Sequence, residues 1–254
     1  MIDIHSHILP SIDDGALTME DAINMARLAV EEGITKIIAT PHHQNGTFIN
    51  KKQDILKSVM DLNHALQNED IPLEVLPGQE TRIYGELLED FDRGDILTLN
   101  HTNYLFIELP SGYVPRYTDQ LLFDLQLKGL TPIIVHPERN AGFMENPEKL
   151  FNFVKKGILT QVTTSSLTGH FGKKIQKFSM QLIETNLTHF IASDAHNIST
   201  RNFRIRESVS KVHKEFGIQA VYYFQENAEL LVQSQPIYKQ EPGKIKHKKF
   251  LGIF

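Results

Sequence analysis

The chain has 254 residues, 41% of them hydrophobic, which is enough to bury the core of one large α/β domain or of two small ones. Its formal net charge of -5 gives no electrostatic reason to expect nucleic-acid binding, so an anionic substrate would need a local positive site. The lack of cysteine excludes a disulfide framework, thiolate metal ligands and a cysteine nucleophile.

Seven apolar segments along the chain predict β-strands. They occupy residues 1–7, 36–43, 73–80, 104–110, 131–138, 157–166 and 189–196. Between the first two, residues 18–33 predict a helix that Thr18 caps and Gly33 ends. Helical patterns that also end in glycine occupy 117–129 and 146–157. Strands that alternate with helices in this way predict a parallel sheet and an α/β fold.

Polar residues recur at the ends of six of these seven strands. They are His5 and His7, His42, Glu80, Glu108, His136, and Asp194 with His196. Only the strand within 157–166 ends without one. In a β/α barrel the carboxyl ends of the strands converge on one mouth, where active sites are built. We therefore expect the strands to close into a barrel that gathers these side chains in one pocket.

Such a pocket calls for metal ions. His5 and His7 are two residues apart on a strand, so both side chains project from the same face. Without cations, clustered carboxylates repel one another, and each carries a large desolvation cost. Nitrogen and oxygen ligands without sulfur favour manganese, iron or zinc over magnesium or calcium. Metal ligation is the interpretation that accounts for the whole series.

Some of these residues also have a plainer explanation. A single His-x-His pair is weak evidence for a metal site, and only the complete series favours one. His43 adjoins His42 but points to the opposite face of the strand, so we expect it to lie behind the ligands or to be exposed. Asp13 and Asp14 precede Gly15, and Asp-Gly pairs are common in turns. Asp14 remains a candidate ligand beside that interpretation.

The motifs "HSHILPSIDDG", "TPHH", "GQE", "IELP", "HPER" and "SDAH", in this order, resemble those of the polymerase and histidinol phosphatase (PHP) superfamily. The chain is most similar to the metal-dependent protein-tyrosine phosphatases of Gram-positive capsule and exopolysaccharide operons. This resemblance implies a distorted seven-stranded (β/α)7 barrel of the PHP type, which we place in residues 1–235. It further implies three divalent metal ions, with manganese as first choice and iron, zinc or magnesium as alternatives.

The resemblance also assigns the site residues. One metal would be held by His5, His7, Glu80 and Asp194, a second by Glu80, Glu108 and His136, and a third by Asp14, His42 and His196. Arg139 and Arg206 match positions near the substrate phosphate, although either could be a surface arginine paired with a carboxylate. His42 and His196 are also candidate catalytic residues. Glu108 stands where many superfamily members have histidine, and this favours the tyrosine phosphatase branch.

The charge of this set favours a phosphate ester as substrate. Asp14, Glu80, Glu108 and Asp194 bring four negative charges. Two divalent ions would leave the site close to neutral, whereas three would leave about +2. The leading hypothesis is a phosphatase that acts on a membrane-associated bacterial tyrosine kinase and its targets and so regulates capsule or exopolysaccharide synthesis. The alternatives are a histidinol phosphatase or other small phosphomonoesterase, and a non-catalytic metal-binding regulatory module.

The last segment, residues 236–254, is expected to be a basic tail. It holds five lysines and one acidic residue. It would serve either as a solubilising tail or as a docking element for an acidic partner or an anionic membrane surface. No segment reads as a secretion signal or reaches the roughly 18 apolar residues that span a bilayer. We therefore expect a cytoplasmic protein, recruited to the membrane through its kinase partner.

Overall fold

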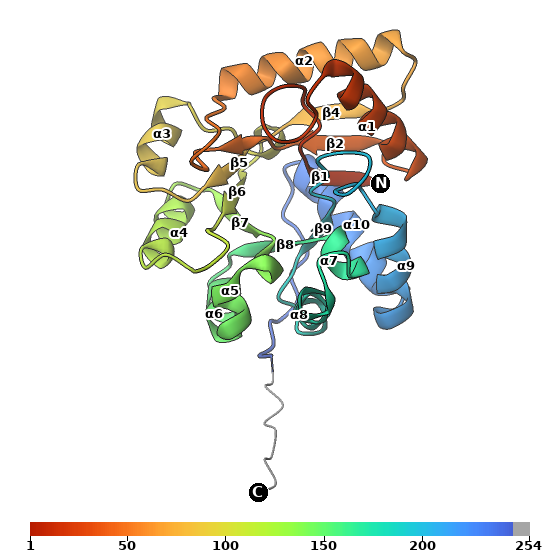
Figure 1. Ribbon diagram of the computed structural model, residues 1–254. Helices are drawn as coiled ribbons and strands as arrows, with labels where there is room; N and C mark the ends of the chain where they lie inside the picture. Colours follow the sequence, from red (N-terminus) through yellow and green to blue (C-terminus); the bar gives the residue numbers. More distant parts are fainter. Residues whose placement is uncertain (246–254) are drawn as a thin grey trace, which may run out of the picture.

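The computed structural model describes residues 1–245, in which strands and helices alternate as predicted (Figure 1). The strands are β1 Ile2–Ser6, β2 Lys36–Ala39, β3 His42–His43, β4 Glu74–Pro77, β5 Glu80–Arg82, β6 Tyr104–Glu108, β7 Thr131–Val135, β8 Leu159–Thr163 and β9 Phe190–Ala192. The helices are α1 Met19–Glu31, α2 Lys52–Asn68, α3 Leu87–Arg93, α4 Thr118–Leu127, α5 Ala141–Glu145, α6 Pro147–Lys155, α7 Thr164–Thr168, α8 Lys173–Glu184, α9 Ile205–Phe216 and α10 Ile218–Val232.

The first predicted helix is confirmed together with its cap. The backbone N–H of Asp21 donates to the Thr18 hydroxyl at 3.1 Å, and the Asp21 carboxylate accepts from the Thr18 backbone N–H at 3.0 Å. This reciprocal pair satisfies two N–H groups that the start of a helix leaves free. Helix α1 is followed by Gly33 at φ 83°, a left-handed conformation that glycine adopts at little cost. Helices α4 and α6 likewise lie within their predicted ranges.

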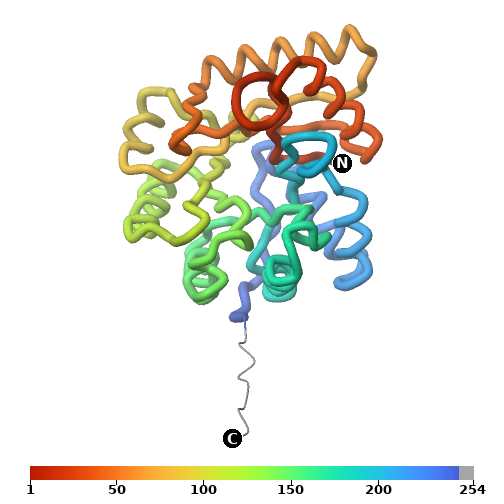
Figure 2. Tube along the Cα trace, in the orientation of Figure 1, coloured from red at the N-terminus to blue at the C-terminus, as the bar shows by residue number. Residues whose placement is uncertain are grey.

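All strand pairs are parallel, which confirms an α/β fold. The strands form a three-stranded sheet in the order β1-β2-β4 and a six-stranded sheet in the order β3-β5-β6-β7-β8-β9. Figure 1 shows the strands at the centre of the molecule with the helices around them, and in Figure 2 the chain passes once around this centre from red to blue. The first and last strands meet, since the backbone of His7 donates to the carbonyl of Ala195 at 2.8 Å.

Two of the predicted strands are interrupted, so that seven predicted segments become nine strands. Segment 36–43 divides into β2 and β3 around Pro41, which has no N–H to donate to a neighbouring strand. Segment 73–80 divides into β4 and β5 at Gly78. A Cβ at Gly78 would lie 2.6 Å from Cγ2 of Ile38 on β2, so there is no room for a side chain at this position.

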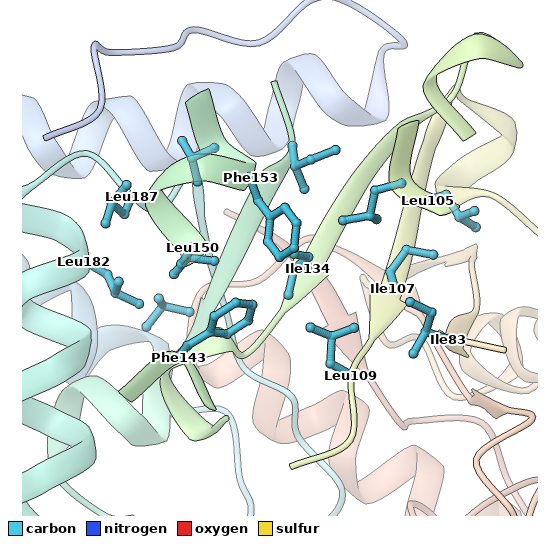
Figure 3. Close-up of a cluster of buried hydrophobic side chains, with 14 of the residues drawn as sticks. Ile83, Leu105, Ile107, Leu109, Ile134, Phe143, Leu150, Phe153, Leu182 and Leu187 are labelled. Carbon is cyan, nitrogen blue, oxygen red and sulfur yellow. The ribbon is translucent and has the colours of Figure 1, made fainter. Parts of the chain in front are cut away.

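Side chains on opposite faces of the strands pack in two different hydrophobic clusters. Ile107 and Ile134 point outward and pack with helix residues such as Phe143 and Phe153, as Figure 3 shows. Their strand neighbours belong to a different cluster, which contains Ile4, Ile38, Phe106, Ile133 and Leu159. Successive side chains of a strand point to opposite faces, so one face of each strand turns to the helices and the other to the interior. Full burial of each such side chain contributes about 1.5–3 kcal/mol.

The beginning of the predicted tail packs against the fold. Ile237 is buried, and the backbone N–H of Tyr238 donates to the side chain of Asn227 in α10 at 2.9 Å. The backbone N–H of Gly243 donates to the carbonyl of Thr185 at 2.7 Å. The rest of that predicted tail, residues 246–254, lies outside the described residues.

Candidate metal centre

The first group of site residues surrounds the end of β1. His5 and His7 are buried, and their Nε2 atoms point to the same two carboxylates. Nε2 of His7 lies 3.3 Å from Oε2 of Glu80 and 3.3 Å from Oδ1 of Asp194. Nε2 of His5 lies 3.5 Å from each of these two oxygens. Residues from β1, from β5 and from the loop after β9 therefore meet at one point.

Glu80 also connects this group to a second one. Its Oε1 lies 2.7 Å from Nε2 of His136, and its Oε2 lies 2.9 Å from Nδ1 of His42. Nδ1 of His42 is 3.7 Å from Oε2 of Glu108, at the end of β6. His136 and Asp194 both have left-handed backbones, with φ of 36° and 53°. His136 is the first residue after β7 and Asp194 the second after β9, so each side chain leaves the end of its strand for the cluster.

Asp14 completes a third group at the outer edge of the cluster. Its Oδ1 lies 3.4 Å from Nε2 of His42 and 3.5 Å from Nε2 of His196. The Asp14 side chain is about half exposed, whereas His196 is buried. All nine residues that the sequence proposed as ligands thus lie together.

The donor atoms of this cluster fit metal ions. Seven of its buried atoms have no hydrogen-bond partner: Nε2 of His5, His7 and His196, Nδ1 of His42, Oε2 of Glu80 and Glu108, and Oδ1 of Asp194. Three sets of side chains bring one ligand atom each to within 4.8 Å of one another: His7, Asp14, His42 and His196; His5, His7 and Glu80; and His42, Glu80 and Glu108. Buried polar atoms normally find partners, and imidazole nitrogen with carboxylate oxygen suits manganese, iron or zinc.

The pKa shifts of five of these nine groups favour the form that binds a cation, whereas at His7 and His42 neighbouring carboxylates outweigh burial and raise the pKa. Burial, and then the charge of Arg139, lower the pKa of His136 to about 3. Burial and the charge of His7 lower the pKa of His196 to about 4. For Asp194 burial raises the pKa, but the charges of Arg139 and His5 outweigh it and hold the pKa well below its usual value. Neutral imidazole and ionised carboxylate are the ligating forms.

Glu108 is different from the other carboxyl groups. Burial, and then the negative charge of Glu80, raise the pKa of Glu108 to about 7. Two carboxylates that share a site repel each other in this way, and one of them then holds a proton near neutral pH. A cation between the two carboxylates would remove the repulsion.

Two residues behind the cluster were not predicted. Oδ2 of Asp13 accepts a hydrogen bond from Nδ1 of His7 at 2.6 Å and another from the backbone N–H of His42 at 3.1 Å. Oε1 of Gln161 accepts from Nδ1 of His5 at 2.9 Å. Such partners fix the orientation of a ligating imidazole and leave its other nitrogen free for the metal. A long polar side chain between Thr160 and Val162 in a predicted strand was the available signal for Gln161.

Three arginines border the cluster. Arg139 and Arg201 both reach Oδ2 of Asp194, at 2.7 Å and 3.1 Å. On the other side, Nε of Arg82 lies 3.1 Å from Oε2 of Glu108. A cavity of about 290 Å³ opens beside Arg82 and Arg139, with His136 and Phe143 also among its walls. The negative cluster is thus joined to a positively charged edge that opens on a cavity.

One residue of the predicted site does not reach the cluster. Arg206 is exposed near the start of α9, and its backbone N–H donates to the side chain of Glu32, which follows α1. Helix α1 ends near the amino ends of the strands, whereas the cluster lies at their carboxyl ends. The backbone of Arg206 is therefore held at the end of the strands opposite the cluster. Among the described residues, the guanidinium of Arg206 forms no ion pair with the cluster. His43, which we expected to lie behind the ligands or to be exposed, is buried and lies near Tyr84 with 6.3 Å between ring centroids.

Gly15 holds the loop that carries Asp14 against β1. A Cβ at this position would lie 1.9 Å from the carbonyl oxygen of His7. We expect Gly15→Ala to lower the free energy of unfolding by about 3 kcal/mol, because the loop must move to relieve the overlap. Urea denaturation measures the change. Gly85→Ala is the matched control, since its Cβ would meet nothing within 4 Å. Equal stability of the two variants would contradict the expected close packing.

Known proteins resemble the chain over its whole length. The model of the family described as capsular polysaccharide synthesis, CpsB/CapC, matches residues 1–233. The tyrosine-protein phosphatase YwqE of Bacillus subtilis is 52% identical over 254 residues, which cover 100% of both chains. The putative tyrosine-protein phosphatase CapC of Staphylococcus aureus is 39% identical and also covered in full.

Solved structures agree with these relatives. A crystal structure from work on YwqE from Bacillus subtilis and CpsB from Streptococcus pneumoniae, described there as unique metal-dependent tyrosine phosphatases, superposes with a TM-score of 0.95 and 52% identity, covering 97% of this chain and 100% of the other. The phosphotriesterase homology protein of Escherichia coli superposes with a TM-score of 0.56 at 10% identity, covering 90% and 97%. The latter likeness concerns the fold alone.

Proposed function

The chain belongs to the CpsB/CapC family of capsular polysaccharide synthesis, and from this premise we infer that it is a metal-dependent tyrosine-protein phosphatase. The observation that carries this inference is the buried cluster of unpartnered imidazole and carboxylate atoms beside paired arginines. Such a cluster suits hydrolysis of a phosphate monoester, because it offers cation sites and a positively charged edge together.

We propose that the cluster holds three divalent ions, with manganese as the first choice. The ligands would be His5, His7, Glu80 and Asp194 for one ion, Glu80, Glu108 and His136 for the second, and Asp14, His42 and His196 for the third. Support comes from the three sets of converging ligand atoms and from the raised pKa of Glu108, whose ionisation a cation would favour. When bound, such ions polarise phosphoryl oxygens and make water a better nucleophile.

The arginines would hold the phosphoryl group of the substrate. Each guanidinium has five N–H donors, so Arg139 and Arg201 can keep their contact with Asp194 and still donate to phosphate oxygens. The cavity beside Arg139 would receive the tyrosine ring. Charge that builds up on the phosphoryl oxygens is then met by donors that are already oriented.

The leaving group requires little help from the protein. A tyrosine phenolate has a pKa of about 10 and departs more readily than an alkoxide. Nδ1 of His196 donates to the carbonyl of Asp194 at 2.9 Å, so a neutral His196 has a free lone pair at Nε2. Its primary role, like that of His42 in the same ligand set, would therefore be to bind metal, and protonation of the phenolate is left to solvent.

We also infer that the two sheets form one distorted seven-stranded barrel. β2 continues into β3 and β4 into β5 after short interruptions, so the nine strands occupy seven positions. Ser6 of β1 forms a parallel bridge with Ala195 after β9, and the backbone N–H of Asp194 donates to the carbonyl of His5 at 2.9 Å. These contacts support closure of the ring between the first and the last strand.

The physiological substrate would be phosphotyrosine on a membrane-associated bacterial tyrosine kinase and its targets, with no nucleic acid involved. No helix in residues 1–245 has the length and apolar character needed to cross a membrane. We propose that the protein works in the cytoplasm and meets the membrane through its kinase. Its catalytic domain would comprise residues 1–235, and residues 236–245 pack on that domain through Ile237 and Gly243.

One experiment separates this function from its alternatives. Phosphate release is measured from a phosphotyrosyl peptide and from histidinol phosphate, after chelation and again with manganese restored. We expect hydrolysis of the peptide to fall at least about tenfold on chelation and to recover with manganese, because the ligands without cations cannot stabilise the developing charge. Preference for histidinol phosphate would overturn the substrate, and no metal-dependent release from either would favour a non-catalytic metal-binding module.

A further inference from the structure

A second cavity adjoins the metal centre on the side opposite Arg82 and Phe143. It measures about 240 Å³ and lies between the loop after β1, helix α1 and the loop after β9. Figure 1 shows these two loops, dark red and light blue, close together near the N-terminus. Asp14 and His196, which belong to the centre, also line this cavity. The cavity therefore reaches the place where the phosphate would bind.

Part of the wall of this second cavity is apolar and open to water. Leu17 and Ile198 lie on its two sides, with 69% and 52% of their surfaces exposed. Met25 of α1, which is buried, also lines it. Exposed leucine and isoleucine gain free energy when another apolar group covers them. Neither residue has a role in the metal centre that would explain its place there.

The size and charge of the cavity limit what can fill it. Pockets for drug-sized ligands measure roughly 300–1,000 Å³, so this cavity suits a single amino-acid side chain. Asp21, which is not a ligand in the proposed centre, brings negative charge to it. An acidic side chain would be repelled there, whereas an apolar side chain would remove Leu17 and Ile198 from water.

We propose that this cavity binds an apolar side chain that lies near the phosphotyrosine in the sequence of the protein substrate. Leu17 and Ile198 are then specificity-determining residues, which select the segment around the phosphotyrosine and take no part in the chemistry. This inference rests on the proposed function, because the position of the phosphotyrosine at the metal centre brings its sequence neighbours to the cavity. Free phenyl phosphate, which has no neighbours, gains nothing from it.

The test compares one double variant with a matched control. Leu17→Ser/Ile198→Ser removes the apolar walls, and Leu127→Ser/Ile218→Ser removes a leucine and an isoleucine with exposures of 71% and 41% on α4 and α10. The substrates are phenyl phosphate and phosphotyrosyl peptides with alanine flanks. Two further sets of peptides each carry one replacement of a flanking alanine, by leucine in one set and by glutamate in the other. The replaced position is one of the two residues before or the two residues after the phosphotyrosine.

For the native chain, we expect the best leucine peptide to exceed the alanine peptide about tenfold in kcat/KM, the usual scale for one apolar group in a fitting pocket. The glutamate peptide at the same position should fall below the alanine peptide. The Leu17→Ser/Ile198→Ser variant should lose the leucine preference and keep its rate on phenyl phosphate, and the control variant should keep both.

Three outcomes would overturn the proposal. The first is equal kcat/KM for all peptides with the native chain, and the second is a leucine preference that survives in the Leu17→Ser/Ile198→Ser variant. Either would leave the phosphatase function intact, because the peptides would still be hydrolysed. The third is no manganese-dependent hydrolysis of any phosphotyrosyl peptide, which would remove the proposed function and this inference together.

Discussion

Glu80→Gln will lower kcat for a phosphotyrosyl peptide by about 10³-fold, the scale on which loss of a central electrostatic group acts in enzymes. Glu80 is fully buried, and its two oxygens face His5, His7, His42 and His136. A glutamine has nearly the same shape but no negative charge, so it cannot serve as an anionic ligand for the two metal ions that we propose Glu80 to share. Steady-state kinetics with saturating manganese measures the loss, and metal analysis of the dialysed protein should show fewer bound ions.

Glu74→Gln is the matched control for this change. Glu74 lies on β4, six residues before Glu80, and its exposed carboxylate pairs with Lys36. An exposed pair of this kind contributes at most about 1 kcal/mol to stability, so both activity and metal content should stay within twofold of the native values. If Glu80→Gln kept its activity and full metal content while remaining folded by circular dichroism, the proposed bridging role of Glu80 would be wrong.

Arg139→Ala and Arg201→Ala will each lower kcat/KM for phosphotyrosyl peptides by about 10²-fold or more, because arginines that stabilise a transferring phosphoryl group contribute on this scale. Arg206→Ala should change kcat/KM by less than twofold. The reason is position: both Arg139 and Arg201 reach Oδ2 of Asp194, whereas the backbone of Arg206 is bound to Glu32.

The same three variants distinguish phosphate binding from a structural role. Inorganic phosphate inhibits by occupying the place of the substrate phosphate, so its inhibition constant should rise in Arg139→Ala and Arg201→Ala and stay constant in Arg206→Ala. Thermal denaturation shows whether each variant is folded. A large loss of activity in Arg206→Ala together with little effect in Arg201→Ala would reverse the assignment and support the family-based prediction.

The position of the cluster could be predicted because it follows from two simple periodicities. Side chains two residues apart share one face of a strand, and the carboxyl ends of parallel strands meet at one place. These rules brought His5 and His7 into one group and predicted that Glu80, His136 and Asp194 would join them. The helix boundaries at Thr18 and Gly33 followed equally from local chemistry, since a cap and a left-handed glycine are properties of a few consecutive residues.

The rest depended on contacts between distant residues. Gln161 and His5 are 156 residues apart, and nothing in a repeating pattern indicates that their side chains form a hydrogen bond. Arg201 and Arg206 both lie in a basic stretch after β9. Only the path of the loop decides which guanidinium faces Asp194. The need for glycine at position 78 was equally hidden, because Ile38, which leaves no room for a Cβ there, lies on another strand.

The left-handed backbones of His136 and Asp194 have a consequence for the behaviour of the protein in solution. A residue other than glycine in this conformation costs about 1–3 kcal/mol, so the polypeptide alone is less stable than its core would allow. A ligand that binds only the folded chain offsets such a cost in proportion to the logarithm of its concentration. The melting temperature should therefore rise with free manganese, and thermal shift would serve as a gauge of how fully the centre is loaded.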